Sequence, residues 1–510
     1  MRIVIRMNKA MPVFACLVLS AVIPFPKGFD LMIYAAGSDR FEKARAFIQE
    51  KIKKEGLPSI SIAVARDGKI IWEESWGLAN IEKRIPATPR TMYSLASATK
   101  PITATAVMIL AERGLVDLDA PASRYLGDGQ LTGYQPLAAT VRRLLQHTAG
   151  LPMHWNLIGG DEAFPRPAMD ETIRRYGFLA APPGEAFAYS NLGYGVLERI
   201  IERVSGRSYK DFVEREVFAP LGMDRSAVLP GPGREAGVAL AYGARQEPFP
   251  PFDFDHRGAS AAFCSAHDLA RFAMFHLQNS LPGQKKILSA KAIRSMQSEK
   301  DPQVPASIYS LGWSSFVNSK IHFVSHSGGM LGVGARLTLL PEKDSACVVL
   351  ANGAPTMEGT ELWDVEWEIL KAIVPGFPES PEIPPPPAAP AAFIPPDSLV
   401  GIWQGNVHAN NADLPVQLTI ENTGQVRLEL DGQENVALAV PTPLGSLGFS
   451  DDILLAPFLA GLKTPDTARS PHILLLKLKL RGDKLDGVAS AIAMNQRFCY
   501  PHWIELARQK

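Results

Sequence analysis

The sequence predicts an α+β fold, an antiparallel sheet flanked by helices, followed by a small all-β domain. Three observations predict it. Strand-like runs lie near both ends of residues 37–374, a long and mainly helical segment separates them, and short alternating strands dominate the end of the chain. A single sheet built from both ends, with a large helical insertion, is the simplest arrangement of these elements.

The first elements are predicted to be a helix and a hairpin. Apolar residues recur at helical spacing over residues 40–55, which favours an amphipathic helix. Ser59–Val64 and Lys69–Trp72 follow as strand-like runs on either side of Asp67-Gly68. An Asp-Gly pair between two such runs is typical of a tight hairpin turn.

The remaining elements of the first domain lie far along the chain. The sequence after about Gln278 offers three more strands and a final helix, whereas the segment from Pro101 to about Gln278 is mainly helical. The strands are expected at His322–Ser325, Ala335–Leu340 and Ala346–Ala351, and the helix at Glu361–Ile373.

A proline-rich stretch predicts the domain boundary. Prolines crowd residues 375–397, which disfavours helix and sheet and favours an extended linker. Residues 398–510 then read as short antiparallel strands, which predicts a small barrel or sandwich. Its clearest hairpins pair Pro415–Ile420 with Val426–Leu430, and Ile473–Leu480 with Leu485–Ala491.

Composition narrows the class of function. Lysine plus arginine and aspartate plus glutamate each number 52, so the formal charge is zero. A neutral chain has no field that favours nucleic acid, and a small-molecule or peptide substrate fits better. The four cysteines have no paired spacing, so neither a zinc site nor a disulfide framework is predicted, and no cofactor is expected.

The start of the chain is typical of an export signal. Arg2, Arg6 and Lys9 precede the apolar run Met11–Phe25, which is short for a membrane span. Residues 1–36 are therefore interpreted as a signal that directs the protein to the periplasm or the exterior. The only small-residue cleavage site is the weak Tyr34–Gly37, so an uncleaved N-terminal anchor is the alternative.

Ser97 and Lys100 form a candidate nucleophile and base. Ser97-Ala-Thr-Lys100 opens a helix that continues through Pro101, and serine suits its N-cap. Residues three apart at a helix start project to the same side, so the amine can reach the hydroxyl. A lysine can accept the serine proton only if its pKa is lowered. The alternative without a catalytic role is an N-capped helix with a lysine on its surface.

Two further motifs support the catalytic interpretation. Tyr189-Ser-Asn191 precedes a predicted helix over Val196–Val204; a tyrosine can relay a proton and an asparagine amide can bind a substrate carbonyl. His326-Ser327-Gly328-Gly329 follows a strand-like run and places small residues where a substrate backbone could lie along a sheet edge. His322 shares a strand face with His326, but no third ligand is apparent, so no metal site is predicted.

In this order the three motifs resemble those of the serine β-lactamase and penicillin-binding protein superfamily: Ser-x-x-Lys, Tyr-x-Asn and a relative of Lys-Thr-Gly. The resemblance to its class C-like branch spans about residues 40–374 and predicts the β-lactamase/transpeptidase-like fold. Other stretches that agree are Met92–Ala96, Leu144–Pro152, Pro182–Gly184, Ser265–Arg271, Pro341–Asp344 and Leu350–Asn352.

The resemblance implies roles for the site residues. Ser97 attacks a carbonyl and forms an acyl-enzyme, Lys100 and Tyr189 share the proton transfers, and Asn191 holds the substrate. Which of Lys100 and Tyr189 is the base stays open. The oxyanion hole would comprise the backbone N–H groups of Ser97 and Gly329. His147, in the stretch Leu144–Pro152, is expected to be structural.

One departure from the pattern bears on the substrate. His326 stands where β-lactamases of this branch carry lysine, and histidine is only partly charged near neutral pH. Histidine there is similar to some D-alanyl-D-alanine carboxypeptidases, D-amino-acid peptidases and β-lactamase-like esterases. We therefore expect hydrolysis of a peptide bond near a D-residue or of a small ester. A penicillin-recognising sensor that acylates without turnover, or a weak β-lactamase, is the alternative.

The C-terminal domain carries a fainter resemblance. Leu399–Gly405 looks like the opening strand of lipocalin-like barrels appended to some of these hydrolases. The expectation is a stabilising domain, or one that mediates homo-oligomerisation, without a ligand of its own. No catalytic residue is predicted beyond Ile394.

Overall fold

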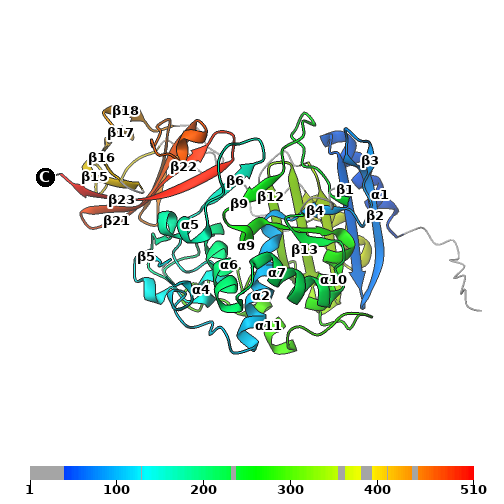
Figure 1. Ribbon diagram of the computed structural model, residues 1–510. Coiled ribbons are helices and arrows are strands. Elements are labelled where there is room, and N and C mark those ends of the chain that lie inside the picture. Colours follow the sequence, from blue (N-terminus) through cyan, green and yellow to red (C-terminus); the bar gives the residue numbers. More distant parts are fainter. Residues whose placement is uncertain are drawn as a thin grey trace, which may run out of the picture. The chain divides into compact units, whose positions relative to one another are not determined.

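Strands from distant parts of the chain meet in one antiparallel sheet. The computed structural model describes residues 40–127, 129–230, 237–353, 362–380, 393–409, 412–438 and 446–509. Its seven-stranded sheet has the order β11-β12-β13-β14-β1-β2-β3 (Figure 1). The strands are β1 (Ser59–Arg66), β2 (Lys69–Asn80), β3 (Ile85–Pro86), β11 (Ser314–Asn318), β12 (Ile321–Met330), β13 (Val333–Leu340) and β14 (Ser345–Ala351). The predicted sheet of both chain ends is confirmed.

Asp67 and Gly68 form the turn of the hairpin between β1 and β2, as their sequence predicts. Asp67 and Gly68 have φ angles of 50° and 71°, the left-handed values that a two-residue turn of this kind requires. β1 then pairs with β14 on its other side, so all but its last residue are buried. Burial on both faces explains why β1 is a continuous run of small and apolar residues.

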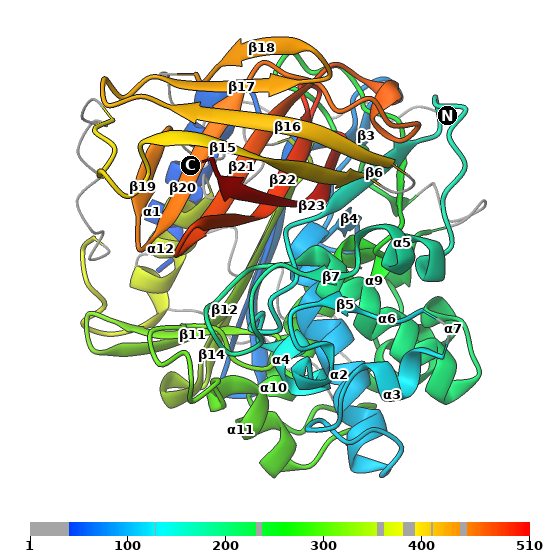
Figure 2. The same ribbon diagram turned by 90° about the vertical axis from the view of Figure 1, so that its left-hand side faces the viewer.

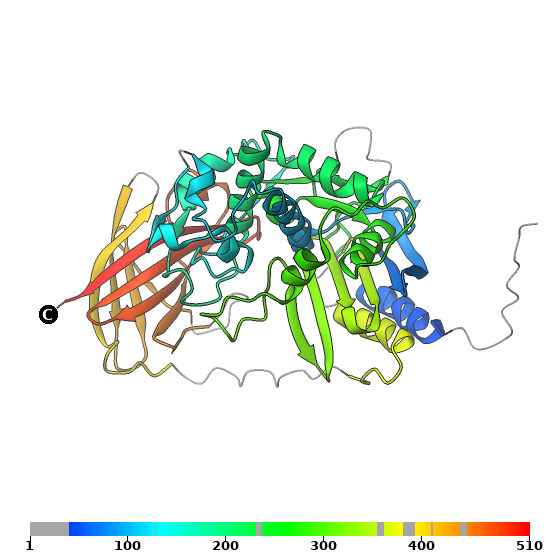
Figure 3. The same cartoon turned by 90° about the horizontal axis from the view of Figure 1, so that it is seen from below.

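Helices cover both faces of this sheet. The predicted first helix is α1 (Glu42–Glu55), and the helix at the end of the domain is α12 (Trp363–Ile373). Lys51 of α1 donates a hydrogen bond of 2.9 Å to Asp364 of α12, and the two helices lie together beside the sheet in Figure 3. α10 (Ala266–His276) packs on β1 and β14. Residue 361, where the sequence predicts the start of α12, lies outside the described residues.

The insertion between the two groups of strands is helical, but it also holds short strands that the sequence pattern does not reveal. Three of them, β4 (Met92–Ser94), β10 (Ala262–Ser265) and β8 (Ser226–Val228), form a small sheet beside the helices. Its helices are α2 (Lys100–Glu112), α3 (Ser123–Leu126), α4 (Val141–Leu145), α5 (Met169–Tyr176), α6 (Asn191–Ser205), α7 (Tyr209–Val213), α8 (Ala219–Leu221) and α9 (Arg257–Ser260); α11 (Ala290–Ser298) follows α10.

The C-terminal region forms a second antiparallel sheet that curls into a half-barrel (Figure 2). A bridge between Ala437 and Phe458 brings its two ends together, and Trp403 is fully buried inside. The predicted all-β architecture and both hairpins are confirmed. The strands, in sheet order, are β18 (Gln433–Val436), β17 (Val426–Leu430), β16 (Ala412–Ile420), β15 (Gly401–Ala409), β23 (Phe498–Arg508), β22 (Lys484–Ala493), β21 (His472–Arg481), β20 (Ile453–Phe458) and β19 (Gly448–Ser450).

A strand of the helical insertion extends this C-terminal sheet. β6 (Trp155–Gly159) pairs with Phe498 and Cys499 of β23 on one side and with β9 (Phe252–Phe254) on the other. The Trp155 indole donates a hydrogen bond of 3.0 Å to the carbonyl of Gln496. The described residues from Lys43 onward form one compact unit. Most of the predicted linker, residues 381–392, lies outside the described residues, and the predicted domain boundaries stay predictions.

The predicted export signal, residues 1–36, also lies outside the described residues. In the part of the chain that the structure describes, no helix has the length and apolar character needed to cross a membrane. Cys264, Cys347 and Cys499 are free thiols and are buried, so they behave as small apolar core residues.

A buried ion pair fixes α12 to the sheet and gives a stability prediction. Nε of Arg336 in β13 donates a hydrogen bond of 2.7 Å to Glu366 Oε2 of α12, and Nη2 forms an ion pair of 2.6 Å with the same oxygen. Both side chains are buried. Glu366→Ala leaves a buried charge unpaired, so we expect urea denaturation to show a loss of about 3–5 kcal/mol. The double variant Arg336→Met/Glu366→Leu should recover most of it. A loss below about 1 kcal/mol in the single variant would contradict this.

Candidate active site

Ser97 lies in a tight turn at the start of the most buried helix. The turn is a 3₁₀ element, η2 (Ala96–Thr99), and α2 follows it directly. Ser97 is therefore not the N-cap of α2: Thr99 holds that position, and its side chain makes no capping hydrogen bond. The N-cap prediction was wrong because the 3₁₀ turn precedes the helix. Ala96 has a φ angle of 44°, a strained value for a residue other than glycine that is frequent beside reactive side chains.

Lys100 is fully buried, and its amine has three hydrogen-bond partners. Nζ lies 3.1 Å from Ser97 Oγ, 2.7 Å from Asn191 Oδ1 and 3.3 Å from the carbonyl oxygen of Ala259. Burial lowers the pKa of Lys100 well below the ordinary lysine value, because an ammonium loses its hydration in this position. The buried amine can therefore stay neutral near neutral pH and accept a proton.

Tyr189 and Asn191 approach from the start of α6. The Ser190 hydroxyl caps this helix by accepting from Gly193 N at 3.1 Å, as expected for serine at an N-cap, and so aims its two neighbours at Lys100. The ring centroid of Tyr189 lies 4.7 Å from Lys100 Nζ. Burial raises the pKa of Tyr189 above the ordinary tyrosine value, and a side-chain hydrogen bond to Ser97 opposes this in part. The phenol therefore stays protonated near neutral pH.

Ser97, Lys100, Tyr189 and Asn191 form one cluster. Ser97, Tyr189 and Asn191 are each partly exposed, whereas Lys100 is buried behind them. A hydroxyl open to solvent and bonded to a neutral amine is the arrangement that acyl transfer through serine needs. The protonated Tyr189 phenol, beside Ser97, can donate a proton to a leaving group.

The third motif lies within β12, which runs past the turn that holds Ser97. β11 pairs only with residues Ile321–Ser325 of β12. Beyond that point β12 keeps β13 on one edge, and the other edge has no strand partner among the described residues. A Cβ on Gly328 would lie 1.9 Å from the carbonyl oxygen of Leu95, so only glycine lets β12 come so close to η2.

His326 does not act as a charged group. Its side chain is buried, with Nε2 2.7 Å from the Tyr309 hydroxyl and Nδ1 2.6 Å from the carbonyl oxygen of Ser327. Nδ1 must donate to that carbonyl, so Nε2 accepts from the tyrosine. Burial, with the nearby Lys100, lowers the pKa of His326 to about 3. The imidazole is therefore neutral at neutral pH. His322, by contrast, bonds to Ser315 at 2.9 Å, so the two histidines have different partners.

The ring of His147 packs against the ring of Tyr189. Its ring centroid lies 4.3 Å from that of Tyr189 and 4.6 Å from that of Tyr309, and its Nδ1 accepts the Ser190 backbone N–H at 3.1 Å. These contacts hold the residues around the second motif in place, which agrees with a structural role. Tyr309 was missed by the sequence analysis, because no local pattern connects it with His326.

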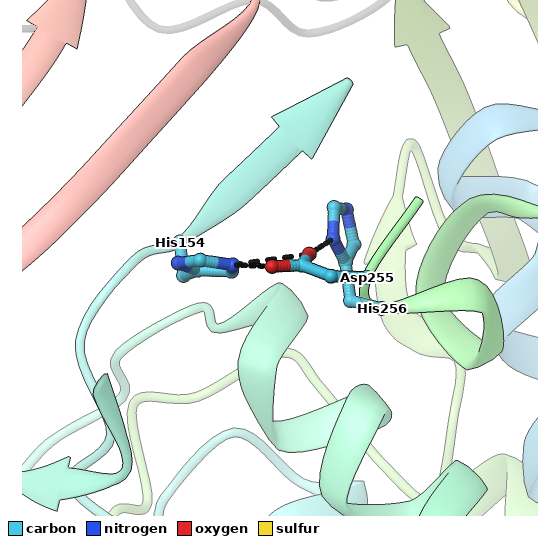
Figure 4. A group of neighbouring side chains, drawn as sticks. All are labelled: His154, Asp255 and His256. Atoms are coloured by element: carbon cyan, nitrogen blue, oxygen red, sulfur yellow. Dashed lines mark hydrogen bonds and ion pairs between the residues drawn. The ribbon is translucent and has the colours of Figure 1, made fainter. Parts of the chain in front are cut away.

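A second polar cluster, also missed, lies deeper in the domain. His154, Asp255 and His256 are fully buried and offer ligand atoms within 4.8 Å of one another (Figure 4). His154 Nε2 lies 3.1 and 3.2 Å from the two carboxylate oxygens, and His256 Nδ1 lies 2.7 Å from one of them. The residues are about a hundred positions apart in the sequence, so only the adjacent Asp255-His256 pair could have drawn attention.

The seven-stranded sheet and the cluster of Ser97, Lys100 and Tyr189 lie in the part of the chain that matches a known protein family. The sequence profile of the beta-lactamase family matches residues 44–371. The chain belongs to this family.

Comparison with individual proteins agrees with this assignment. A relative from Aspergillus campestris, named unguisins hydrolase, is 28% identical to this chain over 326 residues. These residues are 60% of this chain and 60% of that protein. The chain thus matches less than two thirds of that relative. SurE has the same fold, with a TM-score of 0.61 at 24% identity over 92% of this chain and 99% of SurE. A class C beta-lactamase is similar over 67% of this chain and 98% of its own length, with a TM-score of 0.56 at 20% identity.

Gly328 gives a direct test of the approach between β12 and η2. In Gly328→Ala the new methyl group would collide with the Leu95 carbonyl, so β12 must move away from Ser97. We expect the acylation rate with an activated ester to fall about a hundredfold, since small displacements at reacting groups have effects of this size. Gly160→Ala, where a Cβ meets nothing within 4 Å, is the matched control and should react normally. Equal acylation rates in both variants would show that acylation does not depend on the close approach of β12 to η2.

Proposed function

We propose that the protein is a serine hydrolase that works through an acyl-enzyme on Ser97. The observation that carries this proposal is the Lys100 amine, fully buried and 3.1 Å from Ser97 Oγ. Lys100 accepts the serine proton as Oγ attacks the substrate carbonyl. Tyr189 then passes a proton to the leaving group, and water releases the acyl group in a second step. The N–H groups of Ser97 and Gly329 stabilise the oxyanion.

Electrostatics supports Lys100 rather than Tyr189 as the base. Both groups are held in their neutral forms, since burial lowers the pKa of the amine and raises that of the phenol. A neutral amine has a lone pair ready to accept a proton, whereas a neutral phenol is a proton donor. The two residues thus start the reaction in complementary states.

The proposed substrate is a peptide with a D-residue or a small ester. The third motif offers no positive charge, because the His326 imidazole is neutral and tied to Tyr309. A substrate carboxylate would therefore find no ionic partner there, which argues against efficient β-lactam hydrolysis. Two similar proteins fit this view: one is named as a hydrolase of unguisins, and a structure of SurE contains D-Leu.

Apolar side chains beside the cluster also favour an uncharged substrate. Phe187 is 41% exposed, and its ring centroid lies 6.0 Å from that of Tyr309. Met153 is 36% exposed, and its sulfur lies 3.9 Å from the amide nitrogen of Asn191. Exposed large apolar groups next to a reactive serine are typical of a surface that binds apolar parts of a ligand.

The pH dependence of acylation distinguishes the two candidate bases. If Lys100 is the base, kcat/KM rises with pH as the amine loses its proton and levels off well below the ordinary lysine pKa, because burial lowers this pKa. If Tyr189 had to ionise first, the rate would keep rising above about pH 10. A profile of kcat/KM from about pH 5 to about pH 11 measures this, and a rise confined to the alkaline end would refute the assignment of Lys100.

A panel of three substrates tests the function itself. We expect Ser97-dependent release from p-nitrophenyl butyrate or a D-alanyl p-nitroanilide, and Ser97→Ala should lower it by at least about a thousandfold. Nitrocefin carries a carboxylate, so its kcat/KM should be about a hundredfold lower than that of the best substrate. Release that is unchanged in Ser97→Ala would exclude the proposed mechanism, and fast nitrocefin turnover would exclude the proposed specificity.

A further inference from the structure

Asp255 connects several segments around the active site through one buried carboxylate. Its two oxygens accept hydrogen bonds from His154, Asn156, Thr172 and His256, at distances of 2.7 to 3.2 Å. His154 directly precedes β6, Asn156 lies in β6 and Thr172 in α5, whereas His256 leads into α9. Hydrogen bonds to the charged form favour it, so these donors together keep the buried carboxylate ionised.

Hydrogen bonding explains this cluster better than a metal ion does. The Nδ1 atom of His256 lies 2.7 Å from Asp255, the length of a direct charge-assisted hydrogen bond. Histidine ligands of metals almost always donate their other ring N–H to an acceptor. Nδ1 of His154, however, is buried without a hydrogen-bond partner. The carboxylate is thus satisfied by protein donors, and His154 lacks the support that a ligand would have.

His256 lies beside the two helices that carry acceptors of the Lys100 amine. It precedes α9, whose Ala259 carbonyl is 3.3 Å from Lys100 Nζ. Its Cβ is 3.3 Å from where a Cβ on Gly195 would lie, so it packs against α6 one turn after Asn191. Asn191 Oδ1 is the other acceptor of the amine. A shift of His256 would therefore reach α9 and α6 together.

The same network continues to the C-terminal sheet. Asn156, which donates to Asp255, accepts a hydrogen bond of 2.6 Å from Arg469. Arg469 also donates to the hydroxyl of Tyr500 in β23 at 2.8 Å. Asp255 is thus anchored to the C-terminal sheet through Asn156, and His256 connects it to α9, whose Ala259 carbonyl lies beside Lys100.

We propose that Asp255 and His256 form a positioning unit for the catalytic lysine. The carboxylate fixes the imidazole and with it the backbone of His256, whose carbonyl oxygen accepts the Ala259 N–H at 2.9 Å and whose Cβ packs against α6. This assignment rests on the proposed function of Ser97 and Lys100. Neither Asp255 nor His256 touches Ser97, so the unit acts through the placement of Lys100. Loss of the unit should slow acylation and leave substrate binding almost unchanged.

Two variants at His256 separate positioning from simple stability. His256→Ala removes the N–H that Asp255 accepts, and we expect the single-turnover acylation rate with p-nitrophenyl butyrate to fall about 10- to 100-fold at nearly constant KM. His256→Asn keeps an N–H near the position of Nδ1 and should restore the rate to within about threefold of wild type. His276→Ala removes another buried imidazole, 3.1 Å from Thr105, and as the matched control should lose stability but not rate.

The outcomes distinguish this inference from the proposed function. Equal rates in wild type and His256→Ala, or an equal loss in both His256 variants, would overturn the positioning role. If wild type itself fails to acylate, the proposed function fails, and crystal structures of wild type and His256→Ala decide the inference. The contact between Lys100 Nζ and the Ala259 carbonyl should then be lost in the variant. An intact contact would overturn the inference, as would stoichiometric zinc in wild type that His256→Ala releases.

Discussion

The burial of one amine is the constraint on which the active site depends. Lys100 can be buried because the Ser97 hydroxyl, the Asn191 amide oxygen and the Ala259 carbonyl satisfy its hydrogen-bonding capacity. A buried charged amine would be costly, whereas a neutral amine with three polar partners is not. The sheet, α2, α6 and α9 each contribute to this enclosure. The fold therefore lowers the pKa of Lys100 by burying its amine, which is the condition that the proposed role of Lys100 as base requires.

The C-terminal sheet is connected to the surroundings of the site. β6 pairs with β23, and the Cys499 thiol lies 3.9 Å from the carbonyl of Met153. Met153 in turn lies against Asn191. The wall of the site next to Asn191 is thus supported by a strand close to the end of the chain. The pairing of β6 with β23 thus connects the second sheet to the insertion next to Asn191.

Local sequence signals predicted the sheet and both C-terminal hairpins, because periodicity and turn residues act over a few positions. The family resemblance of three short motifs singled out Ser97, Lys100, Tyr189 and Asn191, which the structure brings together. Local sequence signals did not predict the features that contacts between distant segments determine. The length of β12 depends on η2 and Gly328, and β6 exists only because β9 and β23 flank it. The neutral state of His326 and the cluster around Asp255 arise from burial, which a linear pattern does not report.

The central claim is that a neutral Lys100 activates Ser97, and intact-protein mass spectrometry with an activated ester tests it most directly. Wild type should gain one acyl group that peptide mapping places on Ser97. Lys100→Met, which keeps the length of the side chain without the amine, should acylate at least about a thousandfold more slowly while still folded. Acylation at another residue, or at wild-type rate in Lys100→Met, would contradict the account.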